Sequence, residues 1–415
     1  MKKILVSAYA CNPYLGSEPG VGWTAVCRIA RDHKVYVLAD ANHKVSWEKA
    51  RSEEIIPANI EVKFIRKPTK YLENRFIARI QSWLWYTSFN RLVLSAAQEW
   101  HEEQNFDLCH QVTIAAWRLP SPLWRLPIPF IWGPIGGAGY IPKPFRSMLS
   151  PAARVFECVR DIQTFIASRS STFKQCMNGT SVILAANRET LDFLKPFRND
   201  RPLFWLPIVS ISSEKAEQFK PDKNRELARG PLRLFVGGNI EGRKGVSLAL
   251  KALAKVKFQG ISFHYTIAGG GPEISSLKAL TRKLDLNDNV TFHPGYSGKA
   301  YIEALQDSEV YFLPSFREST PVTLLEAYLA NCYPVVADTS AQGEIVKLAG
   351  GKAVAVNNVN DLIEGLADAI KWCSQNRDEL PVMAEVSRKE ILKRFSTACY
   401  EKTLSRAYEI NPSKL

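Results

Sequence analysis

Short runs of apolar, β-favouring residues alternate with segments of helical periodicity along the 415 residues. This alternation predicts βα units with parallel strands. In the first half, we expect strands at residues 3–9, 34–39, 60–66, 107–113, 128–132 and 181–185. In the second half, we expect them at residues 232–236, 263–268, 290–296, 310–313 and 334–338. The fold class is therefore α/β, and two domains are expected at this length.

A polar and charged stretch from Ser212 to Gly230 separates the two sets of strands. Its composition is that of a connector. We therefore predict an N-terminal Rossmann-like domain at 1–207 and a linker at 208–230. A C-terminal Rossmann-like domain follows at 231–395, and a helical segment at 396–415.

The net charge of +13 is concentrated in the first half, where residues 1–210 hold 27 Lys/Arg against 17 Asp/Glu. A basic surface can bind nucleic acid, anionic lipid or acidic substrates. No nucleic-acid-binding motif accompanies the charge, so a nucleic-acid partner is not expected. The eight cysteines lack metal-ligand spacing, which indicates reduced thiols and a cytoplasmic protein.

No apolar run is long enough to span a membrane, but residues 66–104 interleave basic and aromatic side chains. This composition suits a peripheral helix on an anionic membrane surface. It equally suits a domain helix with an aromatic core face and solvated cations. The residues concerned are Arg66, Lys67, Lys70, Arg75, Arg79, Arg91, Tyr71, Phe76, Trp83, Trp85, Tyr86 and Phe89.

The most informative stretch runs from Ser308 to Glu344 and reads as strand, loop, helix and strand. Its loop follows the carboxyl end of a parallel strand, where open α/β sheets bind ligands. Glu318 lies in this loop and Glu326 in the helix. Free N–H groups at a helix start form an anion site. The residues expected at this start are Ser319, Thr320, Pro321 and Val322. A phosphate there, flanked by two carboxylates, fits a nucleotide sugar. Alternatively, both carboxylates are simply solvated.

The pattern Glu318-x7-Glu326, with Phe312-Leu313-Pro314-Ser315 before it and Pro334-Val335-Val336 after it, resembles glycosyltransferase family 4. The resemblance is strongest over residues 230–350. It implies a GT-B fold, in which two Rossmann-like domains face each other across a cleft and the last helix returns to the first domain. It also implies a retaining transferase in which Glu326 contacts the ribose and Glu318 the sugar.

Three further loops of the second half fit a donor site. Gly238, Asn239, Arg243 and Lys244 follow the strand at 232–236 and precede a helix. Arg243 and Lys244 can neutralise a diphosphate leaving group; a solvated basic turn is the alternative. The family resemblance matches Lys244, whereas Asn239 stands where the family has an arginine, and Arg243 is the candidate to compensate. By the same resemblance, Gly270 lies against the nucleotide and Gly295 at the edge that binds its base.

The first half offers a candidate acceptor region. A glycine-rich loop with Gly16, Glu18 and Gly20 follows the first strand, ahead of a helix expected from Gly22. Gly136 and Gly137 turn at the end of the strand at 128–132. The resemblance places the first loop near donor phosphates and acceptor, and implies that His110 touches the transferred sugar. Glycines needed only for turn geometry and a structural histidine are the alternatives.

Together these residues predict a metal-independent, retaining hexosyltransferase. Its donor would be of the UDP or GDP type. The resemblance to glycosyltransferase family 4 implies a lipid-linked saccharide acceptor in cell-surface or exopolysaccharide biosynthesis. No DxD metal-diphosphate motif is present, and no cofactor is expected. Two alternatives remain open: a GT-B sugar-nucleotide epimerase or phosphorylase, and a non-catalytic scaffold that binds membrane or nucleic acid.

Overall fold

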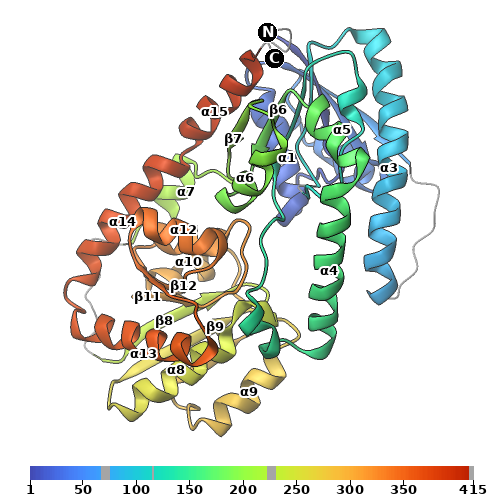
Figure 1. Ribbon diagram of the computed structural model, residues 1–415. Helices are drawn as coiled ribbons and strands as arrows, with labels where there is room; N and C mark the ends of the chain where they lie inside the picture. The colour runs from blue at the N-terminus through green and yellow to red at the C-terminus, as the bar shows by residue number, and fades with distance from the viewer. Residues whose placement is uncertain (67–74, 115, 222–229, 411–415) are drawn as a thin grey trace. The chain divides into compact units, whose positions relative to one another are not determined.

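The computed structural model describes residues 1–66, 75–114, 116–221 and 230–410, with the backbone alone for residues 75–87. The predicted α/β class is confirmed: the strands form two parallel sheets, each in a Rossmann-like unit (Figure 1). Unit 1 comprises Met1–Ala138, Gln163–Ile208 and Glu401–Leu415. Unit 2 comprises Gly139–Ile162 and Val209–Tyr400. The helices α4 (Pro151–Arg169) and α15 (Thr397–Glu409) each contain residues of both units.

Unit 1 is built on a seven-stranded sheet of order β3-β2-β1-β4-β5-β6-β7. Its strands are β1 (Lys3–Ser7), β2 (Lys34–Asp40), β3 (Ile60–Ile65), β4 (Leu108–Gln111), β5 (Phe130–Ile135), β6 (Val182–Ala185) and β7 (Leu203–Trp205). Its helices are α1 (Ser17–Ile29), α2 (Lys44–Ser52), α3 (Arg75–Gln104), α5 (Ser171–Gly179) and α6 (Arg188–Leu194), with short turns η1 (Ala41–His43), η2 (Leu123–Arg125) and η4 (Lys195–Phe197).

Unit 2 has a six-stranded sheet of order β10-β9-β8-β11-β12-β13. Its strands are β8 (Leu232–Gly237), β9 (Phe263–Ala268), β10 (Val290–His293), β11 (Val310–Leu313), β12 (Tyr333–Ala337) and β13 (Lys352–Val354). The helices are α7 (Ser213–Gln218), α8 (Val246–Phe258), α9 (Ile274–Lys283), α10 (Gly298–Gln306), α11 (Val322–Leu329), α12 (Ser340–Ala349), α13 (Val359–Gln375) and α14 (Leu380–Phe395), with turns η3 (Lys143–Met148) and η5 (Gly242–Lys244).

Both sheets are buried because helices cover them, as parallel sheets require. Every residue of β4, β5, β6, β11 and β12 is buried, which matches their continuous apolar runs. In unit 1, α3 packs on β1 and β3, and Tyr36, Trp100 and Trp132 lie in one hydrophobic core. In unit 2, α8 packs against α13. The central strands carry their carboxyl ends to one edge of each sheet, and the loops after these strands line that edge.

Two features differ from the sequence-based expectation. The segment expected as a glycine loop before Gly22 is already helical, because α1 begins at Ser17. Gly20 and Gly22 permit this close packing: a Cβ at Gly22 would lie 2.0 Å from the Ala10 carbonyl oxygen. The edge strands β7 and β13 were not expected; each has three residues, too few for a periodic signal.

Candidate functional site

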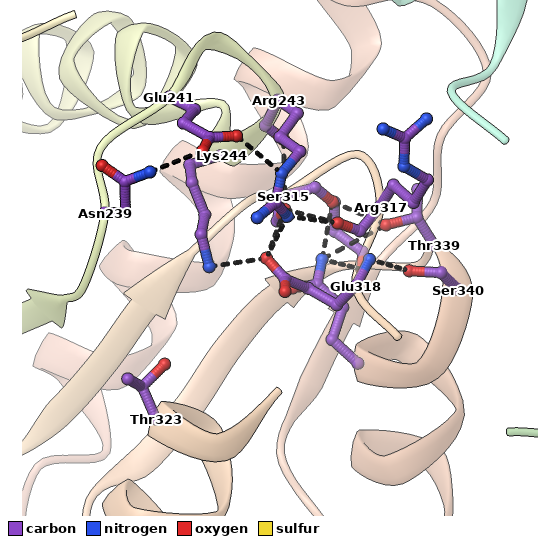
Figure 2. A network of polar contacts seen from close by, with 12 residues as sticks. Asn239, Glu241, Arg243, Lys244, Ser315, Arg317, Glu318, Thr323, Thr339 and Ser340 are labelled. Carbon is purple, nitrogen blue, oxygen red and sulfur yellow. Dashed lines mark hydrogen bonds and ion pairs between the residues drawn. The ribbon is translucent and has the colours of Figure 1, made fainter. Parts of the chain in front are cut away.

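A cluster of polar side chains in unit 2 surrounds the Glu318 carboxylate, in the loop between β11 and α11 (Figure 2). Glu318 Oε1 lies 2.7 Å from Lys244 Nζ and 3.2 Å from Arg243 Nη1. The Ser315 hydroxyl donates to the same oxygen over 2.8 Å. Glu318 and Lys244, expected to share a site, are therefore brought together by two different strand-to-helix loops.

The cluster holds Glu318 as an anion although the side chain is buried. Burial raises the pKa of this carboxyl, but Lys244 and then Arg243 lower it, and the pKa falls below its ordinary value of 4.5. For Arg243, burial lowers the pKa while Glu318 and Glu241 raise it, and the net pKa is raised. An ionised carboxylate with further lone pairs can accept hydrogen bonds from substrate hydroxyls.

Backbone geometry brings the two loops together. Gly245 has φ 67°, and a Cβ there would lie 2.1 Å from the Pro314 carbonyl oxygen. The Phe316 N–H donates to the Arg243 carbonyl oxygen over 2.7 Å, and Arg243 Nη1 donates to the Arg317 carbonyl oxygen over 2.8 Å. Only glycine permits this approach of the β8–α8 and β11–α11 loops without strain.

Asn239 does not reach the carboxylate cluster directly. Its amide donates to Glu241 Oε1 over 2.5 Å, and the other oxygen of Glu241 lies 3.0 Å from Arg243 Nε. Glu241 therefore connects Asn239 to Arg243, as Figure 2 shows. Arg243 contacts Glu318, so it is positioned to supply the positive charge that Asn239 lacks.

Glu326 lies inside α11 and is mostly buried, with its side chain 14% exposed. Its Oε1 lies 2.8 Å from Lys215 Nζ, and its Oε2 accepts from the Tyr301 hydroxyl over 2.9 Å. Burial raises the pKa of the Tyr301 hydroxyl, and the negative charge of Glu326 raises it further. Each carboxylate oxygen retains a lone pair beyond these contacts, so a ligand hydroxyl can share the site.

The expected helix start is displaced slightly, because α11 begins at Val322 with Pro321 as its N-cap. Ser319 is exposed and Thr320 half-buried. Thr320 Oγ1 is buried and has no hydrogen-bond partner among the described residues. A hydroxyl held in this way before a helix start is a group that a bound ligand could satisfy.

The remaining glycine turns border the carboxyl edge of the same sheet. Gly238 has φ 115°, and its carbonyl oxygen would lie 1.9 Å from a Cβ at Gly269. Gly270 has open space around its Cβ position, whereas a Cβ at Gly295 would lie 3.9 Å from the Gly269 Cα. The β8, β9 and β10 loops thus converge without side chains between their backbones.

In unit 1, the predicted acceptor residues flank β1 and β5. Glu18 Oε1 accepts from the Ile114 N–H over 2.7 Å, and Gly16 is exposed with no neighbour near its Cβ position. Gly136 pairs with Ala116 in an isolated bridge. Arg118 Nη1 donates to the Gly137 carbonyl oxygen over 2.6 Å. These contacts join segments far apart in the sequence, and the role of these residues toward an acceptor stays a prediction.

His110 is fully buried in β4. Its Nε2 donates to the Gly133 carbonyl oxygen, and its Nδ1 accepts from the Tyr408 hydroxyl, each over 2.7 Å. Burial lowers the pKa of His110 to about 4, although the hydrogen bond to the Gly133 carbonyl oxygen acts to raise it. Both ring nitrogens are used within unit 1, so the predicted contact with the sugar requires one of these hydrogen bonds to break. That contact stays a prediction.

Several site residues were not identified from the sequence. Ser315, in the loop after β11, and Ser340, the first residue of α12, both contact Glu318, and nothing in their local sequence indicated this role. Lys215 and Tyr301 carried no signal because they come from separate helices. Among the described residues, no group of three His, Cys, Asp or Glu side chains could hold a metal ion. None of the helices in that part of the chain is both long and apolar enough to cross a membrane.

The region containing this cluster matches a known family. Residues 217–388 fit the family model described as "Glycosyl transferases group 1". Over these residues, less than half of the chain, the protein is similar to the group 1 glycosyl transferases. The predicted resemblance to glycosyltransferase family 4 is thereby confirmed.

The relatives that match this chain cover part of its length. WcaL of Escherichia coli K12, whose name places it in colanic acid biosynthesis, is 29% identical over 184 residues, or 42% of this chain and 44% of WcaL. The chain thus matches less than half the length of that relative. Sucrose-phosphate synthase of Thermosynechococcus elongatus has a TM-score of 0.68 at 14% identity over 98% of both chains. Anabaena HepE, solved in complex with UDP, has a TM-score of 0.65 at 14% identity over 100% of both chains. At this identity the two structures establish the GT-B fold alone.

Proposed function

We propose that this chain is a retaining, metal-independent glycosyltransferase that moves a hexose from a nucleoside diphosphate sugar. One observation carries the proposal: an ionised, buried Glu318 lies between Lys244 and Arg243 in the loop that precedes α11. A carboxylate suits sugar hydroxyls and paired cations suit a diphosphate. The group 1 match over the same residues supports this assignment.

In this proposal the cluster has two tasks. Glu318 accepts hydrogen bonds from the transferred sugar and orients it. Lys244 and Arg243 stabilise the charge that grows on the diphosphate as the sugar leaves. These cations do the work that a metal ion performs in metal-dependent transferases. No carboxylate is assigned as a covalent nucleophile.

The nucleotide occupies the neighbouring loops in the same proposal. Glu326 accepts from the ribose hydroxyls, Gly238, Gly270 and Gly295 let backbone approach the nucleotide, and the start of α11 binds phosphate. Thr320 Oγ1, buried without a partner among the described residues, supports a ligand at this place. The UDP bound to HepE favours a uridine donor, with guanosine as the tested alternative.

The acceptor is proposed as a lipid-linked saccharide used for cell-surface or exopolysaccharide assembly. The WcaL relationship supports this class. Gly16, Glu18, Gly20, Gly136 and Gly137 are its candidate contacts. A cytoplasmic protein peripheral to the inner membrane follows from such an acceptor. The aromatic and basic side chains predicted to meet the membrane at 67–87 lie outside the described residues.

The decisive experiment is calorimetric titration of the full chain with UDP, GDP and ADP and their glucose conjugates. We expect one uridine or guanosine ligand to bind, and Glu326→Ala to weaken it strongly. Lys244→Met should lower kcat/KM by about 100-fold or more, as loss of a charge-stabilising group does. Glu364→Ala, which removes an exposed carboxylate paired with Lys255, is the control and should change neither quantity.

Binding that is unchanged in Glu326→Ala would contradict the assignment of Glu326. Binding of no nucleotide by the wild-type chain would contradict the proposed function as a whole. Circular dichroism of each variant separates loss of binding from loss of fold.

A further inference from the structure

The short helix α7 of unit 2 brings a lysine to the Glu326 carboxylate. Lys215 Nζ lies 2.8 Å from Glu326 Oε1, and the two side chains are 36% and 14% exposed. The residues are 111 positions apart in the sequence. The ion pair therefore depends on how α7 packs against α11, the helix that contains Glu326.

The buried guanidinium of Arg388, in α14, fixes α7 next to α11. Its Nη2 donates to the Ala216 carbonyl oxygen over 2.8 Å, and its Nε donates to the Leu329 carbonyl oxygen over 3.0 Å. Ala216 belongs to α7, and Leu329 is the last residue of α11. Figure 1 shows α7 beside α14, as this contact requires. One side chain thus sets the position of the Lys215 backbone relative to the helix that contains Glu326.

The second oxygen of Glu326 is held by a different helix, α10. The Tyr301 hydroxyl donates to Glu326 Oε2 over 2.9 Å. Burial and the charge of Glu326 raise the pKa of Tyr301, so this hydroxyl keeps its proton at neutral pH. The Tyr301 ring lies 6.1 Å from the Phe235 ring and 6.3 Å from the Phe219 ring, centroid to centroid. A Cβ at Gly237 would lie 3.3 Å from the same ring, so the ring is packed on several sides.

Two donors from separate helices fix both the position and the rotation of the Glu326 carboxylate. Each oxygen accepts one hydrogen bond from the protein and keeps a lone pair for a ligand. Two neighbouring acceptors in a fixed plane match two neighbouring hydroxyls, such as the 2′- and 3′-hydroxyls of a ribose. A glutamate held by only one donor would have to be ordered by the ligand, which weakens binding.

We propose that Lys215 and Tyr301 are positioning residues that make the nucleotide site selective for ribose over 2′-deoxyribose, because they fix the Glu326 carboxylate. This inference rests on the proposed function, in which Glu326 accepts from the ribose hydroxyls. Lys215 also balances the charge of Glu326, which would otherwise repel a diphosphate. A purely structural or electrostatic role of Lys215 would affect ribonucleotides and deoxyribonucleotides equally. A positioning role affects the ribonucleotide more.

Calorimetric titration of the full chain with UDP and 2′-deoxy-UDP, and with GDP and 2′-deoxy-GDP, tests the inference. In one of these pairs, wild type should bind the ribonucleotide about tenfold more tightly or better, since the deoxyribonucleotide lacks one hydrogen bond to a charged group. Lys215→Met should weaken binding of the ribonucleotide by about tenfold and bring the two affinities close together. Lys215→Arg keeps the charge and the donors and should restore the preference. Lys220→Met removes an exposed lysine paired with Glu217 and should bind like wild type.

A second variant tests the other oxygen of the carboxylate. Tyr301→Phe keeps the packed ring and removes only the donor, so it should also narrow the preference for the ribonucleotide. In a Glu326→Gln background, neither Lys215→Met nor Tyr301→Phe should narrow the preference further, because the carboxylate that they orient is absent.

A ribose preference that is unchanged in Lys215→Met would overturn the inference and leave the proposed function intact. Equal weakening of both nucleotides would overturn it too, as would equal affinity of wild type for the two members of a pair. Binding of no nucleotide by wild type would overturn the proposed function and this inference with it. Circular dichroism of each variant separates a change in selectivity from a loss of fold.

Discussion

At the residue scale, the site depends on where backbone can approach backbone. Gly245 is in the left-handed region and lies against the Pro314 carbonyl, so Lys244 and the Ser315–Glu318 loop meet. The ion pairs of Glu318 then follow from this approach. A side chain at Gly245 would separate the residues that hold the carboxylate.

We predict that Gly245→Ala lowers the free energy of unfolding by about 2–3 kcal/mol, because it adds a backbone clash to left-handed strain. Nucleotide affinity should fall with it. Gly260→Ala is a matched control: Gly260 has φ 76° but open space around its Cβ position. It should cost only about 1 kcal/mol and leave binding unchanged. Urea unfolding and calorimetry provide the two quantities; similar losses in both variants would contradict the role of the close approach.

At the element scale, the buried side of α4 contacts the loop that contains Glu318. Glu157 links the helix to Arg317, the residue next to Glu318. Its carboxylate is buried between two arginines, so the helix contributes to the shape of a loop more than 150 positions away in sequence. Helix α4 therefore supports the Glu318 loop.

Glu157→Gln should lower the free energy of unfolding of unit 2 by about 2 kcal/mol, because it leaves two arginines without their anion. It should also weaken nucleotide binding several-fold through the displaced Glu318 loop. Asp161→Asn removes a half-exposed carboxylate of the same helix and should cost less than about 1 kcal/mol. A larger effect on binding from Asp161→Asn than from Glu157→Gln would refute this explanation.

The packing of α15 gives a second prediction at this scale. The Tyr408 hydroxyl donates to His110, 298 positions away, so α15 completes the polar core of unit 1. Tyr408→Phe should destabilise unit 1 by about 1–2 kcal/mol because it leaves a buried Nδ1 unpaired. Thermal unfolding at pH 7 measures this loss, and an unchanged midpoint would show that the bond adds nothing.

At the scale of the whole molecule, the two units respond differently to acid. The pKa of His110 in unit 1 is lowered from 6.5 to about 4, and that of Glu318 in unit 2 is lowered below 4.5. Unfolded chains bind protons at the ordinary values, so each group favours unfolding as the pH falls below its ordinary pKa. Unit 1 should therefore lose stability first, between pH 6.5 and about 4.

Tryptophan fluorescence can follow unit 1 selectively, because Trp372 is the one tryptophan of the sequence in unit 2. In a Trp372→Phe background, unit 1 should lose roughly 3 kcal/mol of unfolding free energy between pH 6.5 and 4. His110→Gln should be less stable at pH 7 but should lack most of this pH dependence. An equally steep pH dependence in His110→Gln would assign the effect to other groups, such as His33, whose pKa burial also lowers.

The sequence by itself determined the fold class and most strands, because burial on both faces of a parallel sheet leaves a local apolar run. It also predicted that Glu318 and Lys244 lie close together, since both follow strands whose carboxyl ends share one edge. Tertiary packing decided the rest. The start of α1 at Ser17, the three-residue edge strands, and the His110–Tyr408 and Lys215–Glu326 contacts depend on partners far away in the chain. The periodicity of the sequence indicates which side of a helix or strand is buried. Only tertiary packing determines which residues that buried side contacts.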